Sequence, residues 1–174
     1  MPRSSPEGKE TLRWWIIDTE LKHKRILDIG VGQGTYVKMY REVLPPATWV
    51  GIDIWEPYRT QYKLDTIYDE FYLEDVRTFD YQSAGPFDII FAGDILEHMK
   101  KEEAVALVDR MLQSTKDLYV SIPIIYLPQK ADHGNPYEEH IKPDWSHKEF
   151  TDTFPQVKKS YAGKLIGVYH LTGN

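Results

Sequence analysis

Three glycines in alternation follow a short apolar run near the start of the chain. The run Ile26–Leu27–Asp28–Ile29 precedes Gly30, Gly32 and Gly34, and the residues after them place apolar side chains at helical spacing from position 36 to 44. This order predicts a buried strand, a glycine turn and a helix. Glycines let the backbone approach a ligand without a Cβ in the way, and N–H groups at a helix start can donate to an anion. The pattern therefore indicates a ligand-binding loop in an α/β sheet.

Strands and helices alternate along the rest of the chain. Apolar patterns predict strands at residues 25–30, 48–54, 71–73, 87–92 and 118–125, and helices at 10–21, 36–44, 58–68 and 102–114. A polar, aromatic loop over 129–145 leads to a short helix at 146–154 and to two strands at 157–161 and 165–171, which form a hairpin. We expect a doubly wound, seven-stranded, mostly parallel sheet with a C-terminal antiparallel hairpin. The expected organisation is one domain over 10–174, after a flexible N-terminus over 1–9.

Charge and composition exclude several classes of function. The chain has 21 Lys and Arg against 27 Asp and Glu, a formal charge of −6, so nucleic acid is an unfavourable partner. Without cysteine there is no disulfide framework, thiolate zinc site or cysteine nucleophile. The longest uncharged stretch, residues 118–129, is too short to cross a bilayer, and the start has no signal-peptide pattern. We expect a cytoplasmic protein without a membrane segment. A homodimer is also expected as an option, because a second subunit would add surface that so short a chain lacks.

Two acidic residues at strand ends accompany the glycine loop. Asp53 closes the second predicted strand, 23 positions after Gly30, which suits the two hydroxyls of a ribose. Asp75 follows the third predicted strand. The glycines and Asp53 alone would also suit a nicotinamide dinucleotide. However, a dinucleotide loop has the spacing Gly-x-Gly-x-x-Gly, whereas position 35 is Thr and the third glycine is Gly34.

In these motifs the chain resembles the class I S-adenosylmethionine-dependent methyltransferases, which have a Rossmann-like fold. The first motif of that family, an acidic residue and Gly-x-Gly-x-Gly after a strand, matches Asp28 to Gly34, and residues 87–98 resemble its fourth motif in the form found in enzymes that act on small-molecule or sugar hydroxyls. The resemblance implies that Asp28 and the loop hold the methionine moiety, Asp53 the ribose and Asp75 the adenine amino group. The implied cofactor-binding set is Asp28, Gly30, Val31, Gly32, Gly34, Asp53, Ile54, Asp75, Val76, Gly93 and Asp94. The cofactor would be S-adenosyl-L-methionine and its product S-adenosyl-L-homocysteine.

Histidines and aromatic residues supply candidates for the acceptor side. Methyl transfer depends mainly on positioning, but an oxygen acceptor must lose a proton, for which a histidine near neutral pKa is suited. His98 and His140 are the candidate bases, although Glu97 and His98 could merely begin the next helix. We expect acceptor contacts from His133, Tyr137, Trp145 and His147, unless the loop is only a surface excursion. The loop histidines match no compact ligand spacing, so no metal is predicted.

The sequence thus predicts a methyltransferase that acts on a small polar acceptor, with a hydroxyl favoured. Two alternatives stay open. One is a catalytically inactive domain that keeps the cofactor pocket and serves as a partner or scaffold. The other is an NAD(P)-dependent oxidoreductase.

Overall fold

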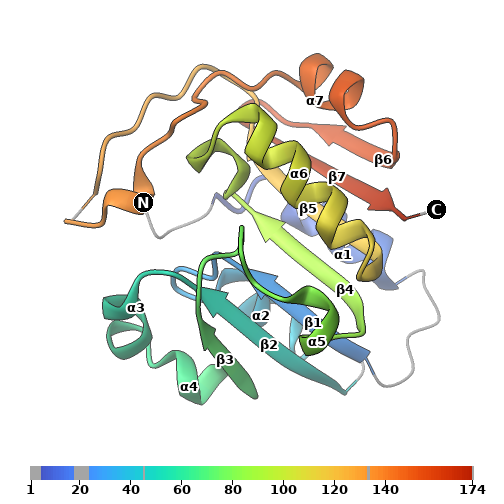
Figure 1. Ribbon diagram of the computed structural model, residues 1–174. Helices are drawn as coiled ribbons and strands as arrows, with labels where there is room; N and C mark the ends of the chain where they lie inside the picture. The colour runs from blue at the N-terminus through green and yellow to red at the C-terminus, as the bar shows by residue number, and fades with distance from the viewer. Residues whose placement is uncertain (1–4, 18–23, 45, 133, 174) are drawn as a thin grey trace.

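The computed structural model describes residues 5–17, 24–44, 46–132 and 134–173, and these form a single seven-stranded sheet (Figure 1). The strands run in the order β3-β2-β1-β4-β5-β7-β6. Neighbours among β1 to β5 are parallel, and β7 is antiparallel to both β5 and β6. The predicted fold class is confirmed. The strands are β1 (Lys24–Ile29), β2 (Ala47–Asp53), β3 (Glu70–Leu73), β4 (Phe87–Gly93), β5 (Thr115–Pro123), β6 (Val157–Ala162) and β7 (Ile166–Thr172).

Helices cover both faces of the sheet. Side chains of α1 (Lys9–Ile17), α2 (Thr35–Tyr40), α3 (Glu56–Gln61) and α4 (Leu64–Ile67) pack in one apolar cluster, and those of α5 (Tyr81–Ala84), α6 (Lys101–Leu112) and α7 (His147–Thr153) pack in the other. Successive strand residues point alternately into the two clusters. In β4, Ile90 and Ala92 belong to the cluster with α6, and Ile89 and Phe91 belong to the cluster with α2. None of the helices in the described part of the chain has the length and apolar character that a bilayer crossing requires.

Two expectations about local structure need correction. The helix expected over 58–68 is two short helices, α3 and α4, because the chain breaks at Lys63, whose φ of +54° lies in the left-handed region that ends helices. The short helix α5 and the 3₁₀ turns η1 (Leu96–His98) and η2 (Pro136–Glu138) were not predicted. Residues 18–21 of the first expected helix lie outside the described residues.

The start of the described chain is attached to the C-terminal hairpin. The carboxylate of Glu7 accepts hydrogen bonds from the backbone N–H groups of Lys164, Leu165 and Ile166 at 2.7, 2.8 and 2.9 Å. These bonds satisfy backbone N–H groups of the turn between β6 and β7, and they hold the start of α1 near β7, which α1 contacts. The flexible N-terminus over 1–9 stays a prediction, although in the structure Glu7 makes these specific contacts.

Candidate functional site

A cavity of about 300 Å³ lies at the carboxyl ends of the parallel strands. It sits where the strand order reverses between β1 and β4, the position at which open α/β sheets bind ligands. We call it the switch-point pocket. Most residues implied by the sequence line it: Asp28, Gly30, Val31, Gly32, Asp53, Ile54, Asp75, Val76, Gly93, Asp94, His98 and Tyr137.

The glycine loop forms one wall of this pocket with a backbone that other residues rarely adopt. Gly30, Gly32 and Gly34 have φ values of +61°, +50° and +76°. A Cβ on Gly30 would lie 2.4 Å from the Ile95 side chain. Gly34 does not line the pocket; a Cβ there would lie 2.6 Å from Ile67, so this glycine serves the local packing of α2. The direct cofactor contact expected of Gly34 is therefore not supported by its position.

Two buried carboxylates face the pocket from β1 and β2. Asp53 accepts the Gly32 N–H at 3.0 Å and the Trp55 N–H at 2.8 Å, and burial nevertheless raises its pKa to about 6. Asp28 is only 1% exposed and accepts the Tyr68 O–H at 2.6 Å; burial, with a smaller contribution from nearby Asp53, raises its pKa to about 7. Both acids are thus held where ionisation is unfavourable in the absence of a partner.

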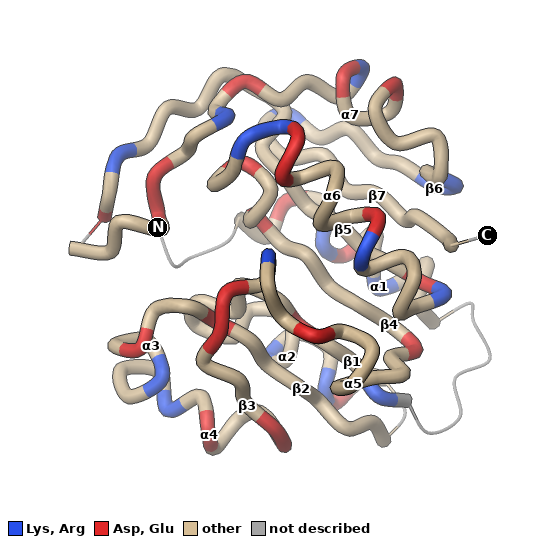
Figure 2. Tube along the Cα trace, in the orientation of Figure 1, with Lys and Arg blue, Asp and Glu red and all other residues tan. Residues whose placement is uncertain are grey.

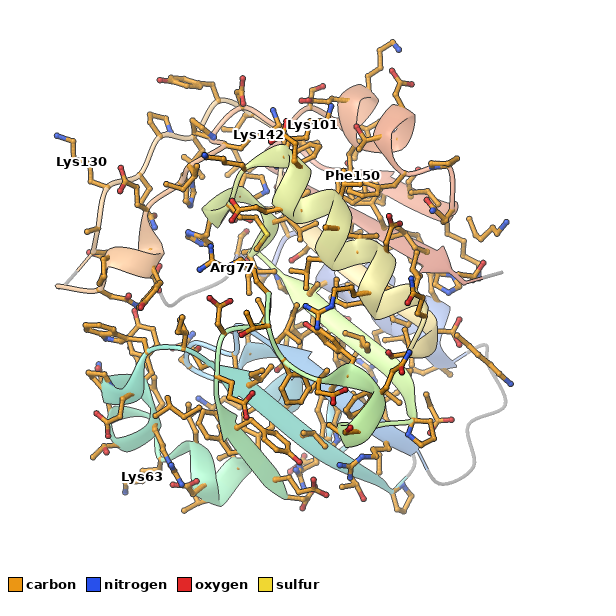
Figure 3. All side chains as sticks on the ribbon, viewed as in Figure 1. Lys63, Arg77, Lys101, Lys130, Lys142 and Phe150 are labelled. Atoms are coloured by element: carbon orange, nitrogen blue, oxygen red, sulfur yellow. The ribbon has the colours of Figure 1, made fainter. Side chains whose placement is uncertain are left out.

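The third expected acid, Asp75, already has a cationic partner. Arg77 binds both of its carboxylate oxygens, with a shortest distance of 2.7 Å, and this holds the Asp75 pKa below its usual range. Figure 3 labels Arg77 on the loop that follows β3. Val76, beside them, is buried and lines the pocket. The carboxylate therefore stays ionised and partly available at the pocket edge.

A buried lysine network below Asp94 was missed by the sequence analysis. Lys9, with a fully buried side chain, donates to Asp94 at 3.3 Å and to Ser121 at 3.2 Å. Ser121 also binds the other Asp94 oxygen at 2.9 Å and accepts the Tyr36 O–H at 2.9 Å. The Tyr36 ring occupies the space that a Cβ on Gly93 would need. One lysine in an amphipathic helix carries no sequence signal of this role.

The two candidate bases lie together beside the pocket. The rings of His98 and His140 are 4.8 Å apart, centroid to centroid, and meet edge to face. His98 Nδ1 contacts the Glu139 carbonyl at 3.0 Å, and His140 Nδ1 contacts the Leu127 carbonyl at 2.6 Å. Burial lowers the pKa of both imidazoles. Only His98 lines the pocket, and His140 supports it from behind.

Glu97 completes this cluster. Its side chain is 2% exposed, its Oε2 has no hydrogen-bond partner, and burial raises its pKa well above the usual range. The Glu97 carbonyl accepts the Lys142 N–H at 3.0 Å, which ties the long loop to η1. Apart from its place in the segment 87–98 and at an expected helix start, Glu97 carries no signal of this position in the sequence.

The 3₁₀ turn η2 places further polar groups over the pocket. Asn135 caps η2 by accepting the Tyr137 N–H at 2.9 Å, and Glu138 accepts the Tyr58 O–H at 2.8 Å. Tyr137 meets Trp55 edge to face at 6.1 Å. Nothing in the sequence assigned a role in the site to Tyr58 or Asn135. Figure 2 shows acidic residues on the loop that follows β3.

Two residues expected to contact the acceptor, Trp145 and His147, do not line the pocket. Trp145 is 1% exposed and packs against Phe150 and Phe154, with Lys101 and Lys142 over its ring; Figure 3 labels both lysines beside α6. His147 Nδ1 contacts the Tyr169 hydroxyl at 3.0 Å, and the imidazole of His147 stacks on the Tyr169 ring. Neither residue lines the pocket, because the chain turns into the core before α7. His133 lies outside the described residues.

Comparison with solved structures gives similar folds at low sequence identity. The N-terminal domain of EvdMO1 with SAH bound has a TM-score of 0.67 at 15% identity, over 98% of this chain and 82% of that chain. Magnesium protoporphyrin IX methyltransferase (ChlM) from Synechocystis PCC 6803 with bound SAM has a TM-score of 0.67 at 15% identity, over 95% and 77%. The small RNA methyltransferase HEN1 has a TM-score of 0.73 at 17% identity, over 99% of this chain but 26% of that chain. These similarities establish the fold.

The sequence itself assigns the family. No curated protein matches the chain. The family described as "Methyltransferase domain" matches residues 26–117, which is more than half of the chain and includes the glycine loop, Asp53, Asp75 and His98. The chain belongs to this methyltransferase domain family.

Proposed function

We propose that this protein uses S-adenosylmethionine to methylate a hydroxyl group of a small polar acceptor. The observation that carries the proposal is the buried Asp53 at the end of β2, which is bonded to the backbone of the glycine loop inside the switch-point pocket. An acid in this position suits the vicinal hydroxyls of a ribose. Two of the similar proteins were crystallised with this cofactor or its product, which supports the same choice here.

The residues present fit such a cofactor. The glycine cradle leaves backbone close to the cavity, and added Cβ atoms would collide with the surrounding side chains. Asp53 would accept from the ribose hydroxyls, and Asp28 lies where the ammonium group of the methionine moiety would find a carboxylate. Asp75 at the edge would accept from the adenine amino group. The volume of about 300 Å³ lies at the lower end of the range for small-molecule pockets.

The bound cofactor supplies an electrophilic methyl group on a sulfonium. In the transfer the acceptor hydroxyl would lose its proton, and the cofactor would be left as a neutral thioether. The chain contributes position and water exclusion, with Tyr137 and Ile141 on the wall beside His98. We propose that His98 and His140 assist the departure of the proton, since both present imidazoles whose pKa is below the usual range.

Binding and turnover test the proposal separately. S-adenosylhomocysteine should raise the melting temperature of the purified protein, while NAD and NADP should not. A labelled methyl group should then appear in a pool of small hydroxyl compounds, with phenol, amine, peptide and RNA pools compared in parallel. Stabilisation by NAD instead would support the oxidoreductase alternative. Binding of S-adenosylhomocysteine with no methyl transfer to any pool would support the scaffold alternative.

A further inference from the structure

We infer that Glu97, His98 and His140 form a binding site for one divalent first-row transition-metal ion at the wall of the switch-point pocket. The site itself is argued from geometry alone. Its role, which is to hold the acceptor oxygen next to the methyl donor, rests on the proposed function. The inference reverses the expectation from sequence that no metal is bound.

The three side chains converge closely enough to share an ion. One carboxylate oxygen and one nitrogen from each imidazole all lie within 4.8 Å of one another. Two ligands of a single ion, each about 2.1 Å from it, are at most about 4.2 Å apart. Rotations that move each donor atom by less than about 1 Å would therefore complete the coordination. Adjacent Glu97 and His98 both belong to η1, and the loop returns His140 to the same place.

Hydrogen bonds fix both imidazoles in the form that a metal requires. A carbonyl oxygen can only accept, so Nδ1 of His98 must donate to Glu139 and Nδ1 of His140 must donate to Leu127. In a neutral imidazole this leaves the lone pair on Nε2. Metal-binding histidines characteristically donate their other N–H to a carbonyl or carboxylate, which orients the ring. Here both rings are oriented in this way before any ion binds.

One oxygen of the Glu97 carboxylate lacks the partner that burial demands. The side chain is 2% exposed and its Oε2 has no hydrogen-bond partner among the described residues. A buried acid without a partner is costly, and a bound cation is one of the few ways to offset that cost. The other nearby acids are already engaged, since Asp94 contacts Lys9 and Ser121, and Glu138 contacts Tyr58. Glu97 is thus the acid that is placed to bind an ion.

Two imidazoles and one carboxylate also indicate the class of metal. Mixed nitrogen and oxygen donors suit Zn²⁺, Fe²⁺, Mn²⁺ or Co²⁺, whereas Mg²⁺ and Ca²⁺ prefer oxygen ligands alone. Three protein ligands leave coordination positions open, as in catalytic rather than structural sites. Because His98 lines the pocket, the open positions face the space for the acceptor. An ion there would take the place of direct proton transfer to the two imidazoles: it would polarise the acceptor hydroxyl, so that the proton leaves to water as the C–O bond forms.

A Co²⁺ titration of the chelator-treated, full-length protein tests the site directly, with visible absorption as the readout. We expect one equivalent to bind, and His140→Ala and Glu97→Gln to weaken binding by at least about tenfold to a hundredfold. His147→Ala is the matched control, because this histidine contacts Tyr169 away from the pocket, and its Co²⁺ affinity should equal that of the wild type. Stabilisation by S-adenosylhomocysteine, measured in each variant, verifies that the pocket is folded.

The outcomes separate the metal site from the proposed function. Stabilisation by S-adenosylhomocysteine without saturable Co²⁺ absorption would overturn the metal site and leave the proposed function standing. Saturable Co²⁺ binding that His140→Ala does not weaken would also overturn the assignment of ligands. Where an acceptor is found, a chelator should abolish methyl transfer by the wild-type protein and added Co²⁺ or Mn²⁺ should restore it. Full activity in the chelator would overturn the role of the ion and favour direct proton transfer to the histidines.

Discussion

Asp28 is a carboxylate that the fold holds at a measurable cost to stability. Its pKa rises from 3.8 to about 7 because it is buried, so the ionised form is less favourable in the folded than in the unfolded protein. The stability that a protonated acid with a raised pKa contributes is fully present below its pKa in the unfolded protein. This stability is lost as the pH rises through its pKa in the folded protein. With 1.36 kcal/mol for each pKa unit, ionisation costs about 4 kcal/mol at pH 8 but only about 1.5 kcal/mol at pH 5.

Replacing Asp28 with Asn removes this pH-dependent cost. The amide oxygen can still accept the Tyr68 O–H, so packing and hydrogen bonding change little. We expect Asp28→Asn to gain stability relative to the wild type by about 2–3 kcal/mol more at pH 8 than at pH 5. The measurement is urea unfolding of both proteins without ligand at several pH values. Because the variant is compared with the wild type at each pH, titration of the other groups largely cancels.

A second variant serves as the control for this experiment. Asp75 is held ionised by Arg77, so its contribution to stability changes only as the pH falls into the acidic range where its lowered pKa lies. The difference between Asp75→Asn and the wild type should therefore stay constant from pH 5 to pH 8. If Asp28→Asn also showed a constant difference, or gained more stability at pH 5 than at pH 8, the burial argument for Asp28 would be refuted.

Three further substitutions test separate parts of the structure. Asp53→Ala should weaken S-adenosylhomocysteine binding, measured by calorimetry, at least about tenfold because charge-assisted hydrogen bonds are lost; unchanged affinity would remove the ribose assignment. Lys9→Met should destabilise the protein by about 3 kcal/mol in urea unfolding, because Asp94 loses its cationic partner; a neutral effect would show that the pair adds nothing. Trp145→Ala should cost about 3–5 kcal/mol of stability through the cavity that the missing ring leaves. The variant should still bind the cofactor with wild-type affinity at low temperature. A loss of affinity without a loss of stability would contradict the place of Trp145 in the core.

The fold was predictable because its signals are local. The strand expected at 118–125 is apolar on both faces, and the glycines after β1 mark a turn that no other residue makes easily. The break at Lys63 was not predictable, since the apolar spacing of 58–68 continues across it and a lysine with positive φ carries no sequence signature. Glu7 was missed for another reason: its partners at 164–166 are distant in sequence, and acids near a chain start are ordinarily solvated.

The same difference between local and distant contacts separates the site residues that could be predicted from those that could not. The positions implied for the cofactor lie at strand ends, and parallel strands bring their ends to one edge, so most of these residues do line one pocket. The loop over 129–145 has no such constraint, because its path depends on bonds such as that between the Lys142 N–H and the Glu97 carbonyl. Aromatic character therefore could not distinguish Tyr137, which lines the pocket, from Trp145, which fills the core.

Among the charged groups around the pocket, the presence of an internal partner separates those that serve the fold from those that we assign to a ligand. Lys9 and Asp94 neutralise each other, and Arg77 neutralises Asp75, so these pairs hold the chain together without anything bound. Among the described residues no cation contacts Asp28, Asp53 or Glu97 directly, and burial raises the pKa of all three. A sequence under selection for stability alone would replace such acids with amides or apolar residues, since their ionisation opposes folding. Asp28 and Asp53 face the space for a cofactor that carries an ammonium group and ribose hydroxyls, and Glu97 faces two oriented imidazoles. The cost of the three acids is therefore best explained by the positively charged and hydrogen-bonding ligands that would offset it.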